Sequence, residues 1–301
     1  MQDDLLISAR GLHKSFGEVE AVRGVDFDIP RGQCIGLLGP NGAGKTTTMR
    51  MIMGLSKPTE GELWMFGRPT TELDPSLRAK VGLVPQDDNL DPDLTVLENL
   101  LVYSRYFELE EAGLHDRAGE LLRFMQLEAK RDAKVQQLSG GMKRRLVIAR
   151  SLLANPEIII LDEPTTGLDP QARVLIWRQL LALRDAGKTL LLSTHYMDEA
   201  ERLCDRIILI DHGKVLDDAS PTVLIDRHVE NHVLEVRKPL PVDLEPDFAI
   251  REDIGDAWLF YVAQPSEALE RLPQTSVFRH RPANLEDVFL RLTGRQLREG
   301  A

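Results

Sequence analysis

The sequence contains little cysteine, with two residues, Cys34 and Cys204, among 301. Their spacing matches no metal-binding motif and both lie in apolar stretches, so we expect small buried side chains of a reducing compartment rather than a disulfide framework. The seven histidines form no ligand cluster. A zinc or iron site held by the protein alone is therefore not expected.

Long apolar runs are also missing, because no segment approaches the roughly 18 apolar residues that cross a bilayer. The opening segment MQDDLLISAR is acidic and lacks the apolar core of a secretory signal. Excess positive charge is absent too, since 37 basic residues face 48 acidic ones and the net charge is −11. A general binder of nucleic acid or anionic lipid is therefore not expected. We expect a cytoplasmic protein with no nucleic-acid partner, which reaches a membrane only through another protein.

The chain does contain an alternation of strand-like and helical segments. Near-continuous apolar runs predict buried parallel strands at 33–39, 157–164 and 188–195, and a helical pattern from Pro170 to Asp185 separates the last two. Strand–helix–strand units of this kind indicate a wound α/β sheet. The N-terminal segment alternates apolar and polar residues, as half-buried antiparallel strands do, and IILIDHGKVLDD predicts a hairpin that turns at His212-Gly213.

The character of the chain changes after about Pro221. The segments HVLEVRK, AWLFYVA and SVFRHR predict short strands, interrupted by PLPVDLEPDF, and NLEDVFLRLTG predicts a helix capped by Asn284 and Gly294. We therefore predict two domains, one over residues 1–221 with a helical subdomain at about 94–150, and a small α+β domain over 222–301.

A glycine-rich loop follows the first predicted buried strand. The sequence GPNGAGKT fits GxxxxGK[ST] at every fixed position and opens a predicted helix. Backbone N–H groups of such a loop approach phosphates closely, and the helix N-terminus adds its positive dipole. We expect Lys45 to reach the β- and γ-phosphates and the Thr46 hydroxyl to coordinate Mg²⁺. The predicted nucleotide contacts in this loop are Gly39, Pro40, Asn41, Gly42, Ala43, Gly44, Lys45, Thr46 and Thr47.

An acidic pair ends the second apolar strand, IIILDE. Asp162 can hold Mg²⁺ through water, and Glu163 is placed to polarise an attacking water. The loop and the pair together indicate a nucleoside triphosphatase, a description that also fits many kinases and helicases.

Five further segments, in order along the first domain, make the chain similar to the ATP-binding subunits of ABC transporters. These segments are KSFG with Phe16, Gln86 after VGLVP, LSGGM (138–142), TTGLDP with Asp169 and LLSTH with His195. The resemblance implies that Phe16 stacks on adenine, that Gln86 senses Mg²⁺ and the γ-phosphate, that Asp169 is the D-loop aspartate and that His195 contacts the γ-phosphate.

The same resemblance implies a P-loop NTPase fold of the ABC type, with a wound sheet, an antiparallel β subdomain and an α-helical subdomain. It also implies ATP and Mg²⁺ as cofactors. The catalytic residues would be Glu163, His195 and Gln86, and the Mg²⁺ ligands would be Thr46, Gln86 and Asp162.

The segment LSGGM supplies a second anion-binding site. Ser139, Gly140 and Gly141 precede a helical stretch and can offer backbone N–H groups and a hydroxyl at a helix N-terminus. The resemblance implies that LSGGM is the signature segment of the family. It also implies that two copies pack head to tail, so that the signature segment of each copy closes over the ATP bound by the other. A homodimer is the expected assembly.

One residue of this segment departs from the family pattern, and a run of basic residues follows it. Met142 stands where the family has glutamine, so a hydrogen bond from that side chain is lost. We interpret Lys143, Arg144 and Arg145 as a solvated or structural cationic turn rather than as ligands.

Two classes of function fit these motifs. One is the ATPase subunit of a transporter, acting through a separate integral-membrane permease at the cytoplasmic face of the inner membrane. The other is a soluble ABC ATPase of translation, DNA repair or cofactor assembly. The chain lacks tandem ATPase units, a long coiled-coil insertion and a basic composition, which favours the first class.

The direction of transport is also expected from resemblance. The C-terminal segment NLEDVFLRLTGRQL is similar to the end of ATPases that serve polysaccharide, drug and lipo-oligosaccharide exporters. In the transporter family, the region around residues 87–93 and the helical insert receives the permease's coupling helix. We therefore predict an exporter ATPase whose cargo is bound by the permease.

Overall fold

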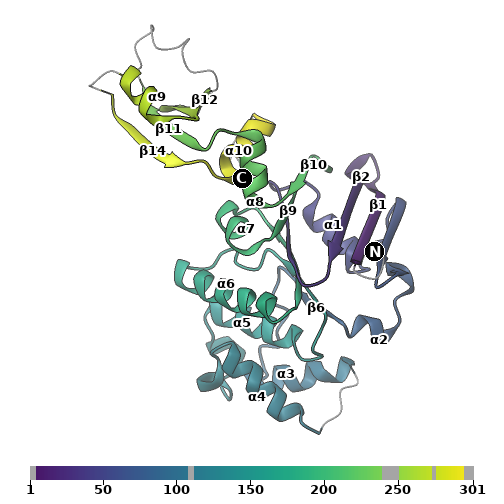
Figure 1. Ribbon diagram of the computed structural model, residues 1–301. Helices are drawn as coiled ribbons and strands as arrows, with labels where there is room; N and C mark the ends of the chain where they lie inside the picture. Colours follow the sequence, from purple (N-terminus) through teal and green to yellow (C-terminus); the bar gives the residue numbers. More distant parts are fainter. Residues whose placement is uncertain (1–4, 108–111, 239–250, 273–275, 295–301) are drawn as a thin grey trace. The chain divides into compact units, whose positions relative to one another are not determined.

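The computed structural model describes residues 5–107, 112–238, 251–272 and 276–294. The chain divides into two compact units, residues 1–217 and 218–301, which are described separately here (Figure 1). The Pro- and Asp-rich segment PLPVDLEPDF lies outside the described residues. In the described part of the chain, no helix combines the length and the apolar character needed to cross a membrane. Cys34 and Cys204 are buried free thiols, as predicted.

The first unit contains an antiparallel sheet built from the N-terminal strands. Its order is β2-β1-β4-β5, with β1 at Leu5–Phe16, β2 at Val19–Pro30, β4 at Glu60–Met65 and β5 at Arg68–Pro69. The second half of β2 alternates buried and more exposed residues, because one face packs on the core, whereas register shifts interrupt this alternation in β1. The predicted antiparallel strands are confirmed.

A second sheet carries the chemistry of this unit. Its order is β10-β9-β3-β8-β7-β6. The strands are β3 (Cys34–Leu38), β6 (Val81–Val84), β7 (Ile158–Asp162), β8 (Thr189–Thr194), β9 (Arg206–Asp211) and β10 (Lys214–Ala219). Neighbouring strands from β9 to β6 run parallel, and β3, β7 and β8 are buried at every residue, as their apolar runs predicted. Parallel strands end at one common edge, so the loops that follow β3, β7 and β8 meet there.

Helices cover this sheet on both faces. Helix α1 (Lys45–Ile52) contacts β2 and β4 of the first sheet and β7 and β8 of the second, and the main hydrophobic core lies around it. Helix α6 (Pro170–Asp185) contacts β8, and α7 (Met197–Leu203) contacts β3 and β8. The predicted helix from Pro170 to Asp185 is confirmed. The predicted hairpin is also present, since His212 and Gly213 take φ values of 47° and 76° between β9 and β10.

Three longer helices lie in the stretch between β6 and β7. They are α3 (Val96–Ser104), α4 (Leu114–Phe124) and α5 (Gly140–Ser151), and they contact one another. Helix α3 begins with a capping box, in which Glu98 N donates to Thr95 Oγ1 (3.1 Å) and Thr95 N donates to Glu98 Oε2 (2.7 Å). Shorter elements of the unit are η1 (Thr70–Glu72), α2 (Pro75–Arg78), η2 (Arg105–Phe107), η3 (Glu128–Lys130) and η4 (Val135–Gln137).

The second unit is a small antiparallel sheet with helices. Its strand order is β12-β13-β11-β14, and α8 and α10 contact each other. The elements are α8 (Pro221–His228), β11 (His232–Arg237), β12 (Arg251–Asp253), β13 (Ala257–Val262), α9 (Pro265–Arg271), β14 (Phe278–Pro282) and α10 (Leu285–Thr293). The caps predicted for the last helix are confirmed, because Asn284 accepts from Asp287 N and Gly294 takes a φ of 68°.

An ion pair between the partly exposed Arg281 and the buried Asp287 joins β14 to α10 in this unit. The guanidinium of Arg281 donates to both carboxylate oxygens of Asp287, at 2.6 and 2.8 Å. The hydroxyl of Tyr261 donates to the same carboxylate at 3.3 Å, and burial raises the pKa of that phenol well above its usual value. This planar two-point contact fixes the last helix against the sheet.

Candidate nucleotide and catalytic site

The phosphate loop connects β3 to α1 and is shaped by close backbone contacts. A Cβ atom at Gly39 would lie 2.0 Å from the carbonyl oxygen of Ile210, and one at Gly44 would lie 2.5 Å from that of Ala21. Gly44 also takes a φ of 105°, which L side chains rarely adopt. Only glycine fits both positions, so the sequence pattern follows from the packing of the loop.

Lys45, the first residue of α1, is held inside this loop. Its ammonium group donates to the carbonyl oxygens of Gly39 at 2.7 Å and Pro40 at 3.0 Å. Burial lowers the pKa of Lys45, and the nearby carboxylates of Glu163 and Asp162 act in the opposite direction. The loop therefore presents a positive charge and a helix N-terminus from within one turn of chain.

The two acidic residues follow β7 at the carboxyl edge of the sheet. Asp162 is 5% exposed and accepts a hydrogen bond from Ser193 Oγ on the neighbouring strand, at 2.5 Å. Burial raises the pKa of Asp162, which the Ser193 hydrogen bond opposes. Glu163 takes a φ of 46°, a left-handed conformation that is rare outside glycine, and Ser193 Oγ accepts from its backbone N–H at 3.1 Å. This turn directs the Glu163 side chain away from the strand.

Three side chains surround the Glu163 carboxylate. His195 Nδ1 lies 3.3 Å from Oε1, Thr166 Oγ1 donates to Oε2 at 3.1 Å, and Gln86 Nε2 lies 3.5 Å from Oε2. The hydrogen bond from His195 is the main cause that lowers the pKa of Glu163 below its usual value, although desolvation acts against it. The structure thus brings together Gln86, Glu163 and His195, which are far apart in sequence.

The donor chemistry of the predicted Mg²⁺ ligands fits that ion. The hydroxyl of Thr46, the amide of Gln86 and the carboxylate of Asp162 offer oxygen atoms, which Mg²⁺ prefers. Thr46 is exposed at the start of α1, so its hydroxyl is accessible from the phosphate loop. These residues and bound phosphate oxygens together can complete an oxygen shell.

The signature segment caps a different helix. Ser139 is the N-cap of α5 and accepts from Met142 N at 3.3 Å, while Gly140 is exposed and Gly141 is buried against Ala172. Among the described residues, no hydrogen bond or ion pair joins Ser139 or the two glycines to the phosphate loop.

The remaining predicted site residues lie near the surface. Asp169 is exposed and caps α6, where it accepts from Ala172 N at 2.9 Å. Phe16 is 56% exposed at the end of β1, and the ammonium of Lys14 lies 5.0 Å from the centre of its ring. An exposed ring of this kind is available to stack on a base. Neither residue contacts the Glu163 cluster in the structure.

Two residues near the site were not predicted as part of it. Ser193 bonds both acidic residues, and its sequence signal was its place two residues before His195 in LLSTH. Arg144 is 4% exposed, so the cationic turn is structural at this position and not solvated. Its guanidinium reaches backbone carbonyls on both sides of the catalytic cluster, which no local pattern indicates.

The fold and these contacts define a P-loop nucleoside triphosphatase. A family model for ABC transporter proteins matches residues 22–166, and one for the C-terminal domain of the nodulation factor export protein NodI matches residues 246–294. A Nod factor export ATP-binding protein I of Cupriavidus metallidurans is 48% identical over 300 residues, which cover 98% of this chain and 99% of the relative. The protein of the same name from Paraburkholderia xenovorans is 50% identical over 292 residues, covering 95% and 96%.

Solved structures agree with this relationship. A dimeric ATP-binding cassette in a post-hydrolysis state with ADP and Pi is 34% identical with a TM-score of 0.64, covering 71% of this chain and 98% of its own. An ATP-binding subunit of an ABC transporter has a TM-score of 0.67 at 30% identity, covering 74% and 92%. The chain therefore belongs to the ABC transporter ATP-binding proteins, in the family of the Nod factor export ATP-binding proteins. It is an ATPase that drives export.

Proposed function

We propose that this protein works as a homodimer that hydrolyses ATP and thereby drives the export of lipo-chitin oligosaccharides through a separate permease. The observation that carries the catalytic part is the cluster of Gln86, Glu163 and His195 beside the buried Lys45. The proposed cargo is supported by the relatives that are named as Nod factor export ATP-binding proteins. The predicted alternatives, a polysaccharide or a drug as cargo, become outcomes of the transport assay below.

In the proposed reaction each residue has one task. Glu163 accepts a proton from the attacking water, and its lowered pKa keeps it ionised at neutral pH. His195 orients the Glu163 carboxylate through its hydrogen bond and contacts the γ-phosphate. Lys45 binds the β- and γ-phosphates, and Asp162 and Thr46 hold Mg²⁺. When bound, that ion neutralises charge that develops on the transferred phosphoryl group.

The dimer explains why the signature stands apart from the phosphate loop of its own chain. Gly140 is exposed at the N-terminus of α5, where backbone N–H groups can meet phosphate oxygens. In a two-fold arrangement each copy would place this helix end on the nucleotide of the other copy. That related cassettes have been solved as dimers supports this assembly.

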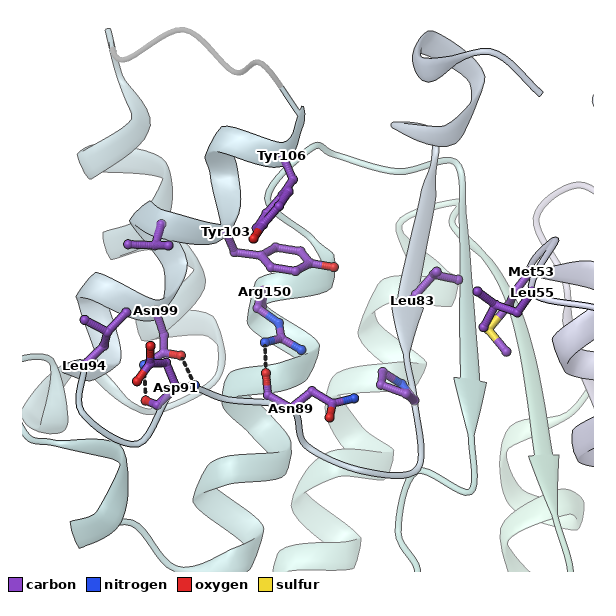
Figure 2. Close-up of a pocket in the computed structure, with 12 residues that line it drawn as sticks. Met53, Leu55, Leu83, Asn89, Asp91, Leu94, Asn99, Tyr103, Tyr106 and Arg150 are labelled. Carbon is purple, nitrogen blue, oxygen red and sulfur yellow. Dashed lines mark hydrogen bonds between the residues drawn. The ribbon is translucent and has the colours of Figure 1, made fainter. Parts of the chain in front are cut away.

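A groove next to the catalytic cluster is the proposed permease site. It measures about 510 Å³, is lined in part by Asn89 and Arg150, and exposes Leu55 (64%), Val102 (43%) and Tyr106 (79%) (Figure 2). Apolar side chains of this size on a surface mark an interaction site. An amphipathic helix of the permease would bury them and place the protein, as a peripheral subunit, at the cytoplasmic face of the inner membrane.

The dimer and the general base are tested with Glu163→Gln. We expect ATP to bind, turnover to be nearly abolished, and sedimentation to show an ATP-dependent dimer. Glu157→Gln is a matched control, because Glu157 precedes the same strand and forms surface ion pairs with Arg31 and Lys80. A Glu163→Gln protein with the control's hydrolysis rate, or one that stays monomeric with ATP, contradicts the assignment.

The permease and the cargo need a membrane assay. Co-expression with a protein of about six apolar spans should give co-purification, and inside-out vesicles should accumulate labelled lipo-chitin oligosaccharide when ATP is added. Tyr106→Asp should abolish co-purification while ATP hydrolysis by the isolated protein stays unchanged. Val277→Asp, at an exposed apolar position outside the groove, should change neither co-purification nor hydrolysis. Accumulation of a polysaccharide or a drug alone would reject the proposed cargo. Ribosome or DNA association without any membrane protein would support the soluble class, which the relatives do not favour.

A further inference from the structure

Helix α5 carries two buried arginines that form no direct ion pair among the described residues, although nearby carboxylates such as Asp88 interact with both at longer range. Arg144 is 4% exposed and Arg150 is 7% exposed, although arginine is rarely buried unless it is paired. In the part of the chain that the structure describes, neither guanidinium lies within ion-pair distance of a carboxylate. Both are satisfied by backbone carbonyl oxygens, which is a specific and directional arrangement.

Arg144 joins two segments that flank the catalytic cluster. Its Nε donates to the carbonyl oxygen of Pro164 at 2.9 Å, and its Nη2 donates to that of Asp162 at 2.8 Å. Its Nη1 donates to the carbonyl oxygen of Pro85 and lies 3.4 Å from that of Gln86. A single planar side chain thus connects the turn after β7 to the loop after β6.

Arg150 holds the other end of that loop. Its Nη1 donates to the carbonyl oxygen of Asn89 at 2.7 Å, as drawn in Figure 2, and its Nη2 donates to that of Asp88 at 3.2 Å. The guanidinium also lies 4.5 Å from the ring centre of Tyr103 on α3, a cation–π distance. The two arginines therefore hold residues 85–89 at both ends, from one helix.

We propose that Arg144 and Arg150 form an arginine clamp through which helix α5 sets the position of the 85–89 loop, and hence of Gln86 opposite Glu163. Arg144 is a positioning residue in this scheme, since its guanidinium is engaged by backbone carbonyl oxygens. The proposal deepens the proposed function and rests on it, with Gln86 as a third Mg²⁺ ligand beside Thr46 and Asp162, as the family resemblance implies. Ser139 caps the same helix, so a shift of the signature segment on dimer closure moves the loop that carries Gln86.

The chemistry of arginine explains why this position needs it. The guanidinium has donors in a fixed planar fork, and here the fork spans carbonyls from two segments at once. Lysine keeps the charge but cannot bridge both segments with that geometry. Substitution by lysine should therefore preserve folding while loosening the loop.

The test uses Arg144→Met, Arg144→Lys and the control Arg145→Met. Arg145 is the next residue of the helix. It donates to the backbone carbonyls of Met125 and Gln126, and weakly, at 3.4 Å, to that of Gly141 one turn back, but not to those that flank the catalytic cluster. For both Arg144 variants we expect ADP affinity to stay at the control's value. The turnover number should fall, and the Mg²⁺ concentration for half-maximal rate should rise, each by about 10-fold or more, as for other residues that support metal ligands. Thermal melting identifies the variants that are folded. If Arg144→Met does not fold, Arg144→Lys alone tests whether Arg144 positions the loop.

A double-mutant cycle with Gln86→Ala separates the clamp from the function on which it rests. If Arg144 acts through Gln86, adding Arg144→Lys to Gln86→Ala should change the Mg²⁺ requirement little. If Arg144→Lys has the same Mg²⁺ requirement as Arg145→Met, the clamp is overturned. If Gln86→Ala nevertheless shows a raised Mg²⁺ requirement, the proposed function still stands. A wild-type Mg²⁺ requirement in Gln86→Ala itself overturns both.

Discussion

Alanine substitutions at the adjacent glycines Gly140 and Gly141 should have different effects. One added methyl group should lower stability at Gly141 and lower activity at Gly140. Gly141 is buried, and a Cβ atom there would lie 2.7 Å from the Cβ of Ala172 on α6. Real Cβ atoms do not approach so closely, so α5 and α6 must move apart. Overpacking of this kind costs about 1–3 kcal/mol, and alanine's lower entropy in the unfolded chain offsets about 0.4–1 kcal/mol of it, so Gly141→Ala should be destabilised by roughly 1–2 kcal/mol.

Gly140 is different, because a Cβ atom there would meet Leu168 at 3.9 Å, an ordinary contact. Alanine in a helix is favoured over glycine by roughly 0.5–1 kcal/mol, so Gly140→Ala should be at least as stable as the wild type. Its methyl group would instead cover the exposed helix end that, in the proposed dimer, meets the phosphates of the other copy. Loss of a preorganised backbone donor lowers turnover by about 10²-fold.

Urea denaturation gives the stabilities and phosphate release gives the turnover. We expect Gly140→Ala to be stable and inactive, and Gly141→Ala to be unstable, with activity lost in proportion to unfolding. Wild-type turnover in Gly140→Ala would refute the contact between the signature and phosphate. Equal stability of Gly141→Ala and the wild type would refute the packing argument between α5 and α6.

Three further predictions follow from the site and from the second unit. Lys45→Ala should weaken ATP binding by about 10-fold or more, because a charge-assisted contact contributes about 1.5–3 kcal/mol; an unchanged dissociation constant by titration would remove Lys45 from the phosphate site. His195→Ala removes the main cause of the lowered pKa of Glu163. A lowered carboxyl pKa contributes stability that is present above the ordinary pKa and lost as pH falls through the lowered one. The pKa of Glu163 should rise without His195, so the acid limb of residual turnover should move to higher pH, and an unmoved limb in the pH–rate profile would contradict this. Asp287→Ala leaves the partly exposed Arg281 without its partner, so unfolding of the second unit should be easier by about 1–3 kcal/mol, less than for a fully buried pair, and an unchanged transition in a thermal or urea melt would show that the pair contributes nothing.

The sequence predicted the elements whose signals are local. The phosphate loop, the helix Pro170–Asp185, the hairpin turn at His212-Gly213 and the caps at Asn284 and Gly294 each depend on residue types within a few positions. Alternation and apolar runs also predicted the strands, since burial on one face or both leaves a direct trace in composition. The residues of the phosphate loop and the acidic pair were reached in the same way, whereas the roles of Phe16, Gln86, Asp169 and His195 came from the resemblance to a known family.

Contacts that depend on backbone atoms could not be predicted in this way. The partners of Arg144 are carbonyl oxygens of Pro164, Asp162 and Pro85. Every residue type has such an oxygen, so no pattern in the sequence marks it as a partner. The predicted cationic turn was accordingly left between a solvated and a structural role.

The sequence by itself indicated a nucleoside triphosphatase, because glycine spacing and a lysine at a helix start are local requirements of phosphate binding. The class of ATPase followed from the resemblance carried by five further segments. The tertiary structure decided how the residues work together. Parallel strands bring Gln86, Glu163 and His195 to one sheet edge, and the left-handed backbone at Glu163 directs its carboxylate to His195. It also decided that a helix far along the chain holds the loop of Gln86. Such relations arise when the sheet and helices pack, because only packing fixes which distant backbone groups a buried guanidinium can reach.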